Sequence, residues 1–171
     1  MIQQGHIKPI WTEQTLESLN FQYRDLSESP EAGKDMYVWD DFNSSERYRN
    51  LVGMNLATVP DLNTFWDEDP WPNLKNKVYA IHHMAPGMMQ PLHGDLYRFY
   101  KQTNGIDDIE TIHRVIVFLL DWQMGHIFHC DNQSIDGWQA GDWIMWSGTT
   151  RHIAANFGYK PRYTLQVTGT F

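Results

Sequence analysis

The stretch "DWIMWSGTTRHIAANFGYKPRYTLQVTGTF", residues 142–171, decides the fold. Its segments "DWIMW", "RHIAANF" and "PRYTLQVTGTF" are rich in β-branched and aromatic residues, and short runs containing Gly, Thr or Pro separate them. These features predict three strands joined by tight turns. The same signals occur upstream in four further segments: "KVYAIHHM" (77–84), "HRVIVFLLDW" (113–122), "GHIFHC" (125–130) and "SIDGWQ" (134–139).

Seven or eight short strands at this spacing are typical of an antiparallel sandwich or barrel such as a jelly roll. The connections "DWQMG", "DNQS", "AGD" and "FGYKP" contain the Gly, Asn, Asp and Pro that tight turns need. We therefore expect a mainly β protein whose jelly-roll core spans residues 77–171. Residues 1–76 form a helical and loop-rich N-terminal part of the same single domain, 1–171.

Two helices are predicted in this N-terminal part, packed on one sheet of the barrel. "WTEQTLESLNFQYRDL" (11–26) has apolar residues at roughly helical spacing after the N-cap candidate Thr12, and "SSERYRNLVGMNLA" (44–57) repeats the pattern after Ser44 or Ser45. The segments 27–35 and 59–73 are rich in Pro, Asp and Asn, which predicts loops. Trp66 and Trp71 are expected to anchor the second loop to the core.

Composition excludes several classes of function. The 171-residue chain has a formal net charge of -8 and no run of Lys or Arg, which argues against nucleic acid or anionic membrane as a partner. The longest apolar run, "VIVFLL", is too short to span a membrane. The sole cysteine, Cys130, excludes an internal disulfide framework, and the start of the chain does not resemble a secretory signal. We expect a cytoplasmic protein, and the sequence leaves its oligomeric state open.

The last two predicted strands carry unusually polar faces. Because side chains alternate along a strand, one face carries His152, Ala154 and Asn156 in the first strand, and Arg162, Thr164, Gln166 and Thr168 in the second. The opposite faces carry Ile153, Ala155 and Phe157, and Tyr163, Leu165 and Val167. If the apolar faces are packed, the polar faces line either solvent or a pocket.

An earlier stretch, "QPLHGDLYRF" (90–99), adds His93 and Asp95 to His152 as candidate metal ligands. Two imidazoles and one carboxylate on one face of an ion are typical of non-haem Fe(II) sites, although Mn or Co also suits such donors and zinc prefers a tetrahedral set. Arg162 favours iron with an acidic cosubstrate. Its planar guanidinium, with the hydroxyl of Thr164 beside it, suits the distal carboxylate of a dicarboxylic acid.

The segments "PLHGD" (91–95) and "GDWIMWSGTTRHIAANFGYKPRYTLQVTG" (141–169), in this order, resemble the Fe(II)/2-oxoglutarate-dependent oxygenases of the double-stranded β-helix fold, especially small phage- or bacterial-type members. The resemblance covers about residues 77–171. It implies that His93, Asp95 and His152 bind iron and that Arg162 forms a salt bridge with 2-oxoglutarate. Thr164 stands where many members have serine, which preserves the hydroxyl. Arg114 resembles a second arginine that some relatives place near the cosubstrate.

The resemblance implies a dioxygenase that uses Fe(II), 2-oxoglutarate and O2, with ascorbate supporting activity. It would hydroxylate a small molecule, an amino acid or a peptidyl side chain such as proline, and convert 2-oxoglutarate to succinate and carbon dioxide. It further implies a bacterial or phage-infected host cytosol. The acidic net charge argues against a nucleic-acid substrate.

A cupin is the alternative, because Gly141, His152 and Asn156 match the spacing of the second cupin motif. The first motif, His-x-His followed by glutamate, is missing, and Ser147 and Thr149 replace the usual Pro and Gly. The alternative function is a non-catalytic cupin-like domain that binds a carboxylate through Arg162 without needing iron.

Further side chains are weaker candidates. His83 shares a strand face with Tyr79 and Ile81 and is a candidate to line the cosubstrate pocket, with a structural histidine as the alternative. Tyr97 follows Asp95 by two residues and is a candidate substrate contact. His126 and His129 have odd spacing and cannot both face a metal. Four tryptophans are expected to serve packing instead of a substrate cage: Trp122, Trp138, Trp143 and Trp146.

Overall fold

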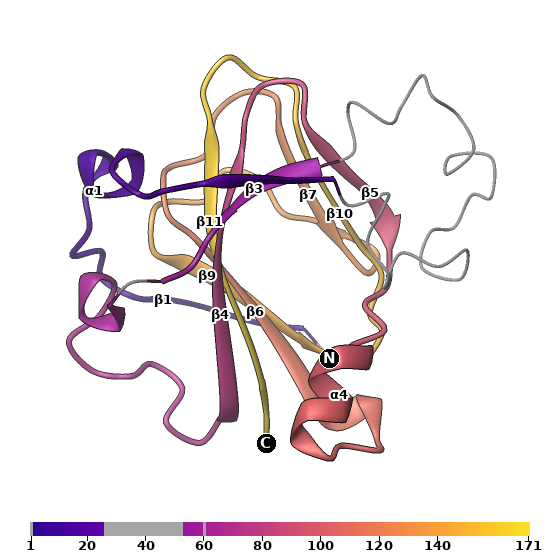
Figure 1. The fold of residues 1–171 in the computed structure, drawn as a ribbon. Coiled ribbons are helices and arrows are strands. Elements are labelled where there is room, and N and C mark those ends of the chain that lie inside the picture. Colours follow the sequence, from indigo (N-terminus) through magenta and orange to yellow (C-terminus); the bar gives the residue numbers. More distant parts are fainter. Residues whose placement is uncertain (1, 26–52, 60) are drawn as a thin grey trace.

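The computed structural model describes residues 2–25, 53–59 and 61–171, and Figure 1 shows two antiparallel sheets facing one another. The larger sheet has the order β1 (Gln3–His6), β9 (Asp142–Ser147), β6 (Ile112–Phe118), β11 (Arg162–Thr170), β4 (Lys75–Met84), β3 (Gly53–Ala57) and β2 (Gln22–Asp25). The smaller sheet has the order β5 (Met89–His93), β10 (His152–Asn156), β7 (His126–Cys130) and β8 (Gln133–Ser134).

The strands from β4 to β11 form a double-stranded β-helix. Along the chain they pass between the sheets, so that β4, β6, β9 and β11 lie in the larger sheet while β5, β7, β8 and β10 lie in the smaller one. The last strand, β11, is hydrogen-bonded between β4 and β6, and β10 between β5 and β7. This strand order is that of a jelly roll, so the predicted fold class is confirmed.

The N-terminal part differs from the prediction. Thr12 caps α1 (Glu13–Glu17) as expected, with its side chain accepting a hydrogen bond from the backbone N–H of Thr15, but the helix lasts only five residues. Residues 22–25 of the same predicted helix form β2, and residues 53–57 of the second predicted helix form β3. Residues 44–52 lie outside the described part of the chain. The helix prediction is wrong for residues 22–25 and 53–57 because β2, β3 and β4 pair in register, which outweighs local helical spacing.

The other helices of the described residues are also short. They are α4 (Arg98–Asn104) and two 3-10 turns, η1 (Leu62–Thr64) and η2 (Ile109–Thr111). In the residues that the structure covers, no helix has the length and apolar character needed to cross a membrane.

The outer face of the larger sheet is packed beneath the N-terminal segment. Ile81, Leu165 and Val167 lie in one buried cluster with aromatic residues from the preceding chain, Trp66 and Trp71 among them. These two indoles are 7% and 6% exposed, and their rings meet edge to face at 5.8 Å. Their predicted role as loop anchors is confirmed. Aromatic loops, together with α1, thus cover the face that was expected to lie under two helices.

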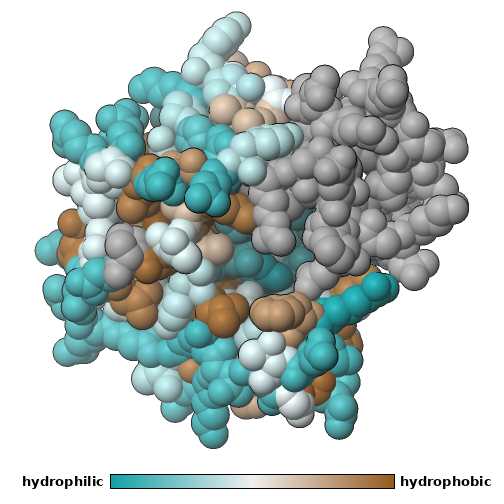
Figure 2. Space-filling model, viewed as in Figure 1, coloured by the Kyte–Doolittle hydropathy of each residue, from teal (hydrophilic) through white to brown (hydrophobic). Residues whose placement is uncertain are grey.

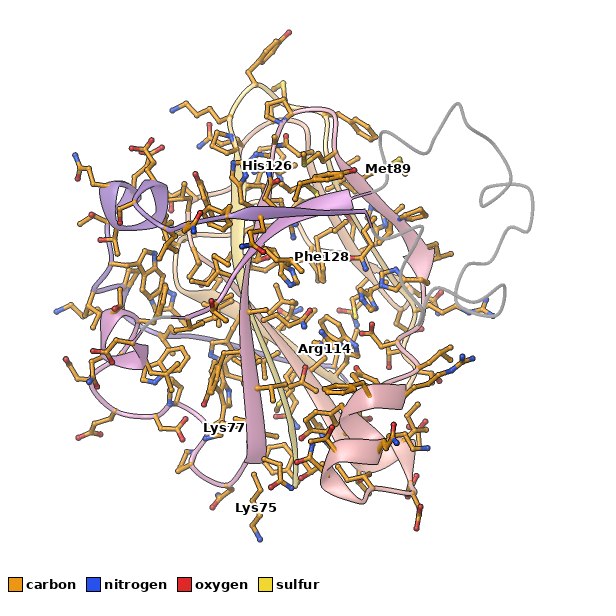
Figure 3. The ribbon with its side chains drawn as sticks, in the orientation of Figure 1. Lys75, Lys77, Met89, Arg114, His126 and Phe128 are labelled. Atoms are coloured by element: carbon orange, nitrogen blue, oxygen red, sulfur yellow. The ribbon has the colours of Figure 1, made fainter. Side chains whose placement is uncertain are left out.

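The inner face of the larger sheet meets the smaller sheet. There Met84, Phe118 and Phe128 belong to a second buried cluster, separate from the outer one. Along β11, Leu165 and Val167 face outward while Thr164 and Thr168 are buried on the inner side. The polar strand faces therefore line the interior of the barrel and not the solvent. Figure 3 shows Arg114 and Phe128 directed into this space from opposite sheets.

Candidate metal and carboxylate site

Strand pairing brings the two candidate histidine ligands together. His93 ends β5, His152 begins β10, and their Cα atoms are directly paired across the smaller sheet. The ring centroids are 4.2 Å apart. Asp95 follows in the next connection and places its carboxylate 4.0 Å from Nε2 of His93 and 3.7 Å from Nε2 of His152. The structure thus gathers the predicted triad, with one ligand atom from each residue within 4.8 Å of the others.

The glycine between the two ligands has a steric role. A Cβ atom on Gly94 would lie 2.7 Å from the carbonyl oxygen of Thr149, closer than real Cβ contacts allow. Thr149 belongs to the turn before β10. Glycine therefore lets the connection carrying Asp95 approach the turn that leads to His152.

Hydrogen bonds orient both imidazoles toward a common point. Nδ1 of His93 donates to the carbonyl of Pro91 at 2.6 Å, and Nδ1 of His152 donates to the carbonyl of Thr150 at 3.0 Å. Each Nε2 then carries the lone pair that a metal needs. The amide nitrogen of Gln90 lies 2.8 Å from Nε2 of His93, consistent with an N–H donating to that lone pair.

The protonation states also suit metal binding. Burial lowers the pKa of His93 and lowers that of His152 to about 3, so both imidazoles are neutral near pH 7. Burial alone would raise the pKa of Asp95, but the positive charge of Arg114, followed by the two histidines, brings it down to about 2. Two neutral imidazoles and one carboxylate are the donor set of a non-haem Fe(II), Mn or Co site, so the residues present fit such an ion.

Arg114 lies beside this triad. It projects from β6, and its Nη2 is 3.0 Å from Oδ2 of Asp95. Its guanidinium carbon is 5.0 Å from the ring centre of Tyr97. Tyr97 is 4% exposed and has a left-handed φ of 51°, a strained conformation for a bulky residue. Arg114 therefore contacts a candidate metal ligand, and the cosubstrate role of Arg114 and the substrate role of Tyr97 stay predictions.

Arg162 has a different environment. It is 4% exposed at the start of β11, with its guanidinium carbon 5.5–5.8 Å from the ring centres of Phe118, Phe128 and Trp138. Across residues 2–25, 53–59 and 61–171 no carboxylate forms a salt bridge with it. Burial lowers its pKa to about 10, which leaves it charged at neutral pH. Thr164, 1% exposed, lies next to it on the same strand face.

The structure gives His83 the structural role that was the alternative to a place in the cosubstrate pocket. His83 lies on the outer face, where its Nδ1 is 2.8 Å from Nδ2 of Asn55 and its ring is 4.8 Å from that of Tyr163. The prediction placed His83 correctly with Tyr79 and Ile81, but that face belongs to the outer core. His82 faces inward instead. Alternation alone could not show which face would be enclosed.

The remaining histidines and tryptophans agree with their predictions. His126 is buried and its Nε2 donates to the carbonyl of Lys160 at 3.1 Å, whereas His129 is exposed on the opposite face of β7. Trp138 and Trp146 are 5% and 1% exposed in the inner core, while Trp122 and Trp143 are half-buried. Trp146 also packs 4.9 Å from the ring of His152.

Comparison with known proteins adds little to this geometry. No family model matches the chain, and no curated protein matches it. Similar solved structures include a predicted oxalate decarboxylase from Thermotoga maritima (17% identity, 70% of this chain and 82% of that one, TM-score 0.45). A cupin 2 conserved barrel domain protein from Salinispora arenicola is 14% identical, with 68% of this chain and 75% of that one covered and a TM-score of 0.41. The Cnp3 cupin domain of Schizosaccharomyces pombe is 12% identical, with 69% of this chain and 61% of that one covered and a TM-score of 0.42. At these TM-scores the likeness carries no argument about activity, and the fold rests on the strand order.

Proposed function

We propose that this chain is an Fe(II)- and 2-oxoglutarate-dependent dioxygenase. The observation that carries the proposal is the buried Arg162, which has no carboxylate partner among the described residues and shares the barrel interior with His93, Asp95 and His152. The order of these residues along the chain is also that of the oxygenases that the sequence resembles.

Energetics favour an anion at Arg162. Removing a guanidinium from water without a counterion costs several kcal/mol, and aromatic faces offset only about 0.5–2 kcal/mol of that cost. A carboxylate can accept two parallel hydrogen bonds from the guanidinium, and the hydroxyl of Thr164 can supply a further donor. Arg162 and Thr164 would therefore hold one end of an elongated dicarboxylate whose other end is directed toward the triad.

In this function the triad would hold the metal. His93, Asp95 and His152 supply three donors from one side, which leaves other positions for the cosubstrate. When bound, Fe(II) would supply the redox chemistry that couples the decarboxylation of 2-oxoglutarate to the hydroxylation of a C–H bond. The backbone bonds of both imidazoles keep their Nε2 atoms aimed inward, and the ring of Trp146 packs 4.9 Å from that of His152.

The substrate class follows the sequence prediction: a small molecule, an amino acid or a peptidyl side chain such as proline, and not nucleic acid. The net charge of -8 supports the last point. A reducing cytosol, bacterial or phage-infected, is part of the same proposal and is consistent with the buried, free Cys130.

The first test measures succinate. The protein is incubated with Fe(II), ascorbate, O2 and 2-oxoglutarate, and succinate is followed by mass spectrometry against an Asp95→Ala sample. Slow succinate formation is expected even without the prime substrate. When candidate substrates are added, a compound that is hydroxylated should gain the mass of one oxygen atom. Equal succinate in both samples would contradict the proposal.

The second test isolates the arginine. Lysine at position 162 keeps the charge but loses the planar fork, so 2-oxoglutarate should bind about 10- to 100-fold more weakly, as expected for a lost charge-assisted hydrogen bond. Titration calorimetry under anaerobic conditions with Mn(II)-loaded protein measures this. Mn(II) affinity is the internal control and should not change. Unchanged 2-oxoglutarate affinity would move the carboxylate site elsewhere, with Arg114 the first position to test.

A non-catalytic cupin-like domain that binds a carboxylate is the second candidate. The Arg114–Asp95 ion pair favours it, because it already compensates the carboxylate charge without a metal. This domain would bind the dicarboxylate at Arg162 equally well with and without Mn(II), and it would form no succinate. Calorimetry with and without the metal therefore separates the two functions.

A further inference from the structure

His82 lies on the inner face of the barrel, next to the residues proposed to hold the carboxylate. Its direct cross-strand partners are Thr164 in β11 and Leu56 in β3. Directly paired residues of antiparallel strands share a face, and Thr164 is buried on the inner side. Two residues along β4, Met84 belongs to the inner core and is paired with Arg162. His82, Thr164 and Arg162 therefore form one continuous polar surface.

Charged groups from both parts of the site act on His82. After burial, the causes that shift its pKa are the charges of Arg114 and Arg162, followed by those of Asp95 and His152. Burial and the two arginines keep its imidazole neutral, with a pKa of about 3, so the ring offers one hydrogen-bond donor and one acceptor.

These hydrogen-bonding groups have no partner in the described protein. In the part of the chain that the structure describes, no side-chain hydrogen bond involves His82, whereas its neighbour His83 is bonded to Asn55. Figure 2 shows hydrophilic atoms in a recess near the middle of the view, where Figure 1 has the space between β4 and β5.

We propose that His82 is a cosubstrate-binding residue: its imidazole N–H donates a hydrogen bond to the dicarboxylate whose far end is held by Arg162 and Thr164. The inference rests on the proposed function, because it takes 2-oxoglutarate as the occupant. It assigns to His82 the role that the sequence gave to His83. A neutral donor at this position adds affinity for an anion without adding a third positive charge to a space that already holds Arg114 and Arg162.

Two substitutions at position 82 and one at position 83 test the proposal. His82→Leu removes the polar atoms at similar volume, His82→Asn keeps a donor, and His83→Leu makes the same change on the outer face of the same strand. The measurement is anaerobic calorimetry of 2-oxoglutarate and of succinate into Mn(II)-loaded protein, after circular dichroism has shown that each variant is folded.

We expect His82→Leu to weaken 2-oxoglutarate binding about 10-fold and His82→Asn to recover most of that loss, while Mn(II) affinity stays constant. His83→Leu should bind as the unchanged protein does. If His82→Leu binds 2-oxoglutarate as tightly as the unchanged protein does, the role of His82 is wrong while the proposed function stands. The same conclusion follows if His83→Leu loses as much affinity as His82→Leu. If the unchanged protein itself does not bind 2-oxoglutarate, the proposed function fails and this inference falls with it.

Discussion

The two ends of the barrel interior treat their charges in opposite ways. At the triad end, His93, Asp95 and His152 are all partnered: the imidazoles by backbone carbonyls and the carboxylate by Arg114. At the arginine end, Arg162 lies among aromatic rings and forms no salt bridge with the described residues. The charges at the first end are paired within the protein, whereas the positive charge at the second has no carboxylate partner among the described residues.

This contrast distinguishes an organised site from an incomplete one. A cluster whose charges are paired within the protein can be built for stability alone, so the ion pair at the triad end does not by itself demand a ligand. A buried cation with no counterion has no such structural explanation. The arginine end therefore supports the proposed anion binding more strongly, and the triad end supports the proposed metal site.

The largest expected effect is a difference in sign between two arginine substitutions. Arg114→Met leaves the carboxylate of Asp95 without its partner and should lower the free energy of unfolding by about 3 kcal/mol, the low end for a broken buried pair, because the Asp95 side chain is 14% exposed. Arg162→Met removes an uncompensated charge and should raise the free energy of unfolding by about 1 kcal/mol. Urea denaturation of metal-free protein at pH 7 measures both. A loss of stability in both variants would abolish the contrast.

Removing a triad imidazole comes next. His93→Ala or His152→Ala should weaken Fe(II) or Mn(II) binding more than about 100-fold, equivalent to about 2.7 kcal/mol, since even partners outside the ligand set contribute 10- to 100-fold. The fold should persist because strand pairing does not depend on these rings. His129→Ala, at an exposed position in β7, is the matched control. Metal affinity that survived in His152→Ala would show that the ion binds elsewhere.

Acid tests a property that His152 and His82 share, an imidazole that the fold keeps neutral. His152 and His82 each have a pKa of about 3 in the fold and about 6.5 when unfolded. Between these values the unfolded chain binds protons that the folded chain rejects, so stability falls as the pH drops below 6.5. His152 alone can lower the free energy of unfolding by at most about 1.4 kcal/mol for each pH unit. Urea midpoints at pH 7, 6 and 5 in EDTA should decrease, and His152→Gln should flatten the slope; parallel slopes would refute the assignment.

The smallest expected effect concerns Gln90, whose amide lies 2.8 Å from Nε2 of His93. A metal must displace this hydrogen bond. Gln90→Leu should therefore strengthen Mn(II) binding about 2- to 10-fold, the equivalent of one hydrogen bond, and leave 2-oxoglutarate affinity per bound metal unchanged. Calorimetric titration of Mn(II) into apoprotein measures it, and weaker binding would mean that Gln90 itself assists the ion.

Sequence reasoning succeeded where spacing alone determines position. His152 and Arg162 lie on consecutive strands of alternating polarity, so a shared polar face could be predicted before the structure, and the structure then showed that this face is the inner one. His93 and Asp95 were recognised by their spacing, and the register of β5 against β10 then brought them to His152.

Sequence reasoning failed where the outcome depends on distant pairing. Residues 22–25 and 53–57 have helical spacing, but their pairing with each other and with β4 makes them strands. The exchange of His82 for His83 has the same origin, since both faces of β4 become covered and only the opposing sheet decides which is inside. The Arg114–Asp95 pair likewise depends on how β6 faces the connection after β5, which no local pattern contains.

The position of β5 at the edge of the smaller sheet has a consequence for motion. Among the residues that the structure describes, it is hydrogen-bonded in that sheet to β10 alone, and its last residue is His93. An ion held jointly by His93, Asp95 and His152 would clamp this edge strand to its neighbour. Loss of the ion would then favour local opening of β5, and amide hydrogens along 89–93 would exchange with solvent faster than those of β7. Occupancy of the metal and fraying of the sheet edge would thus be two measures of a single equilibrium.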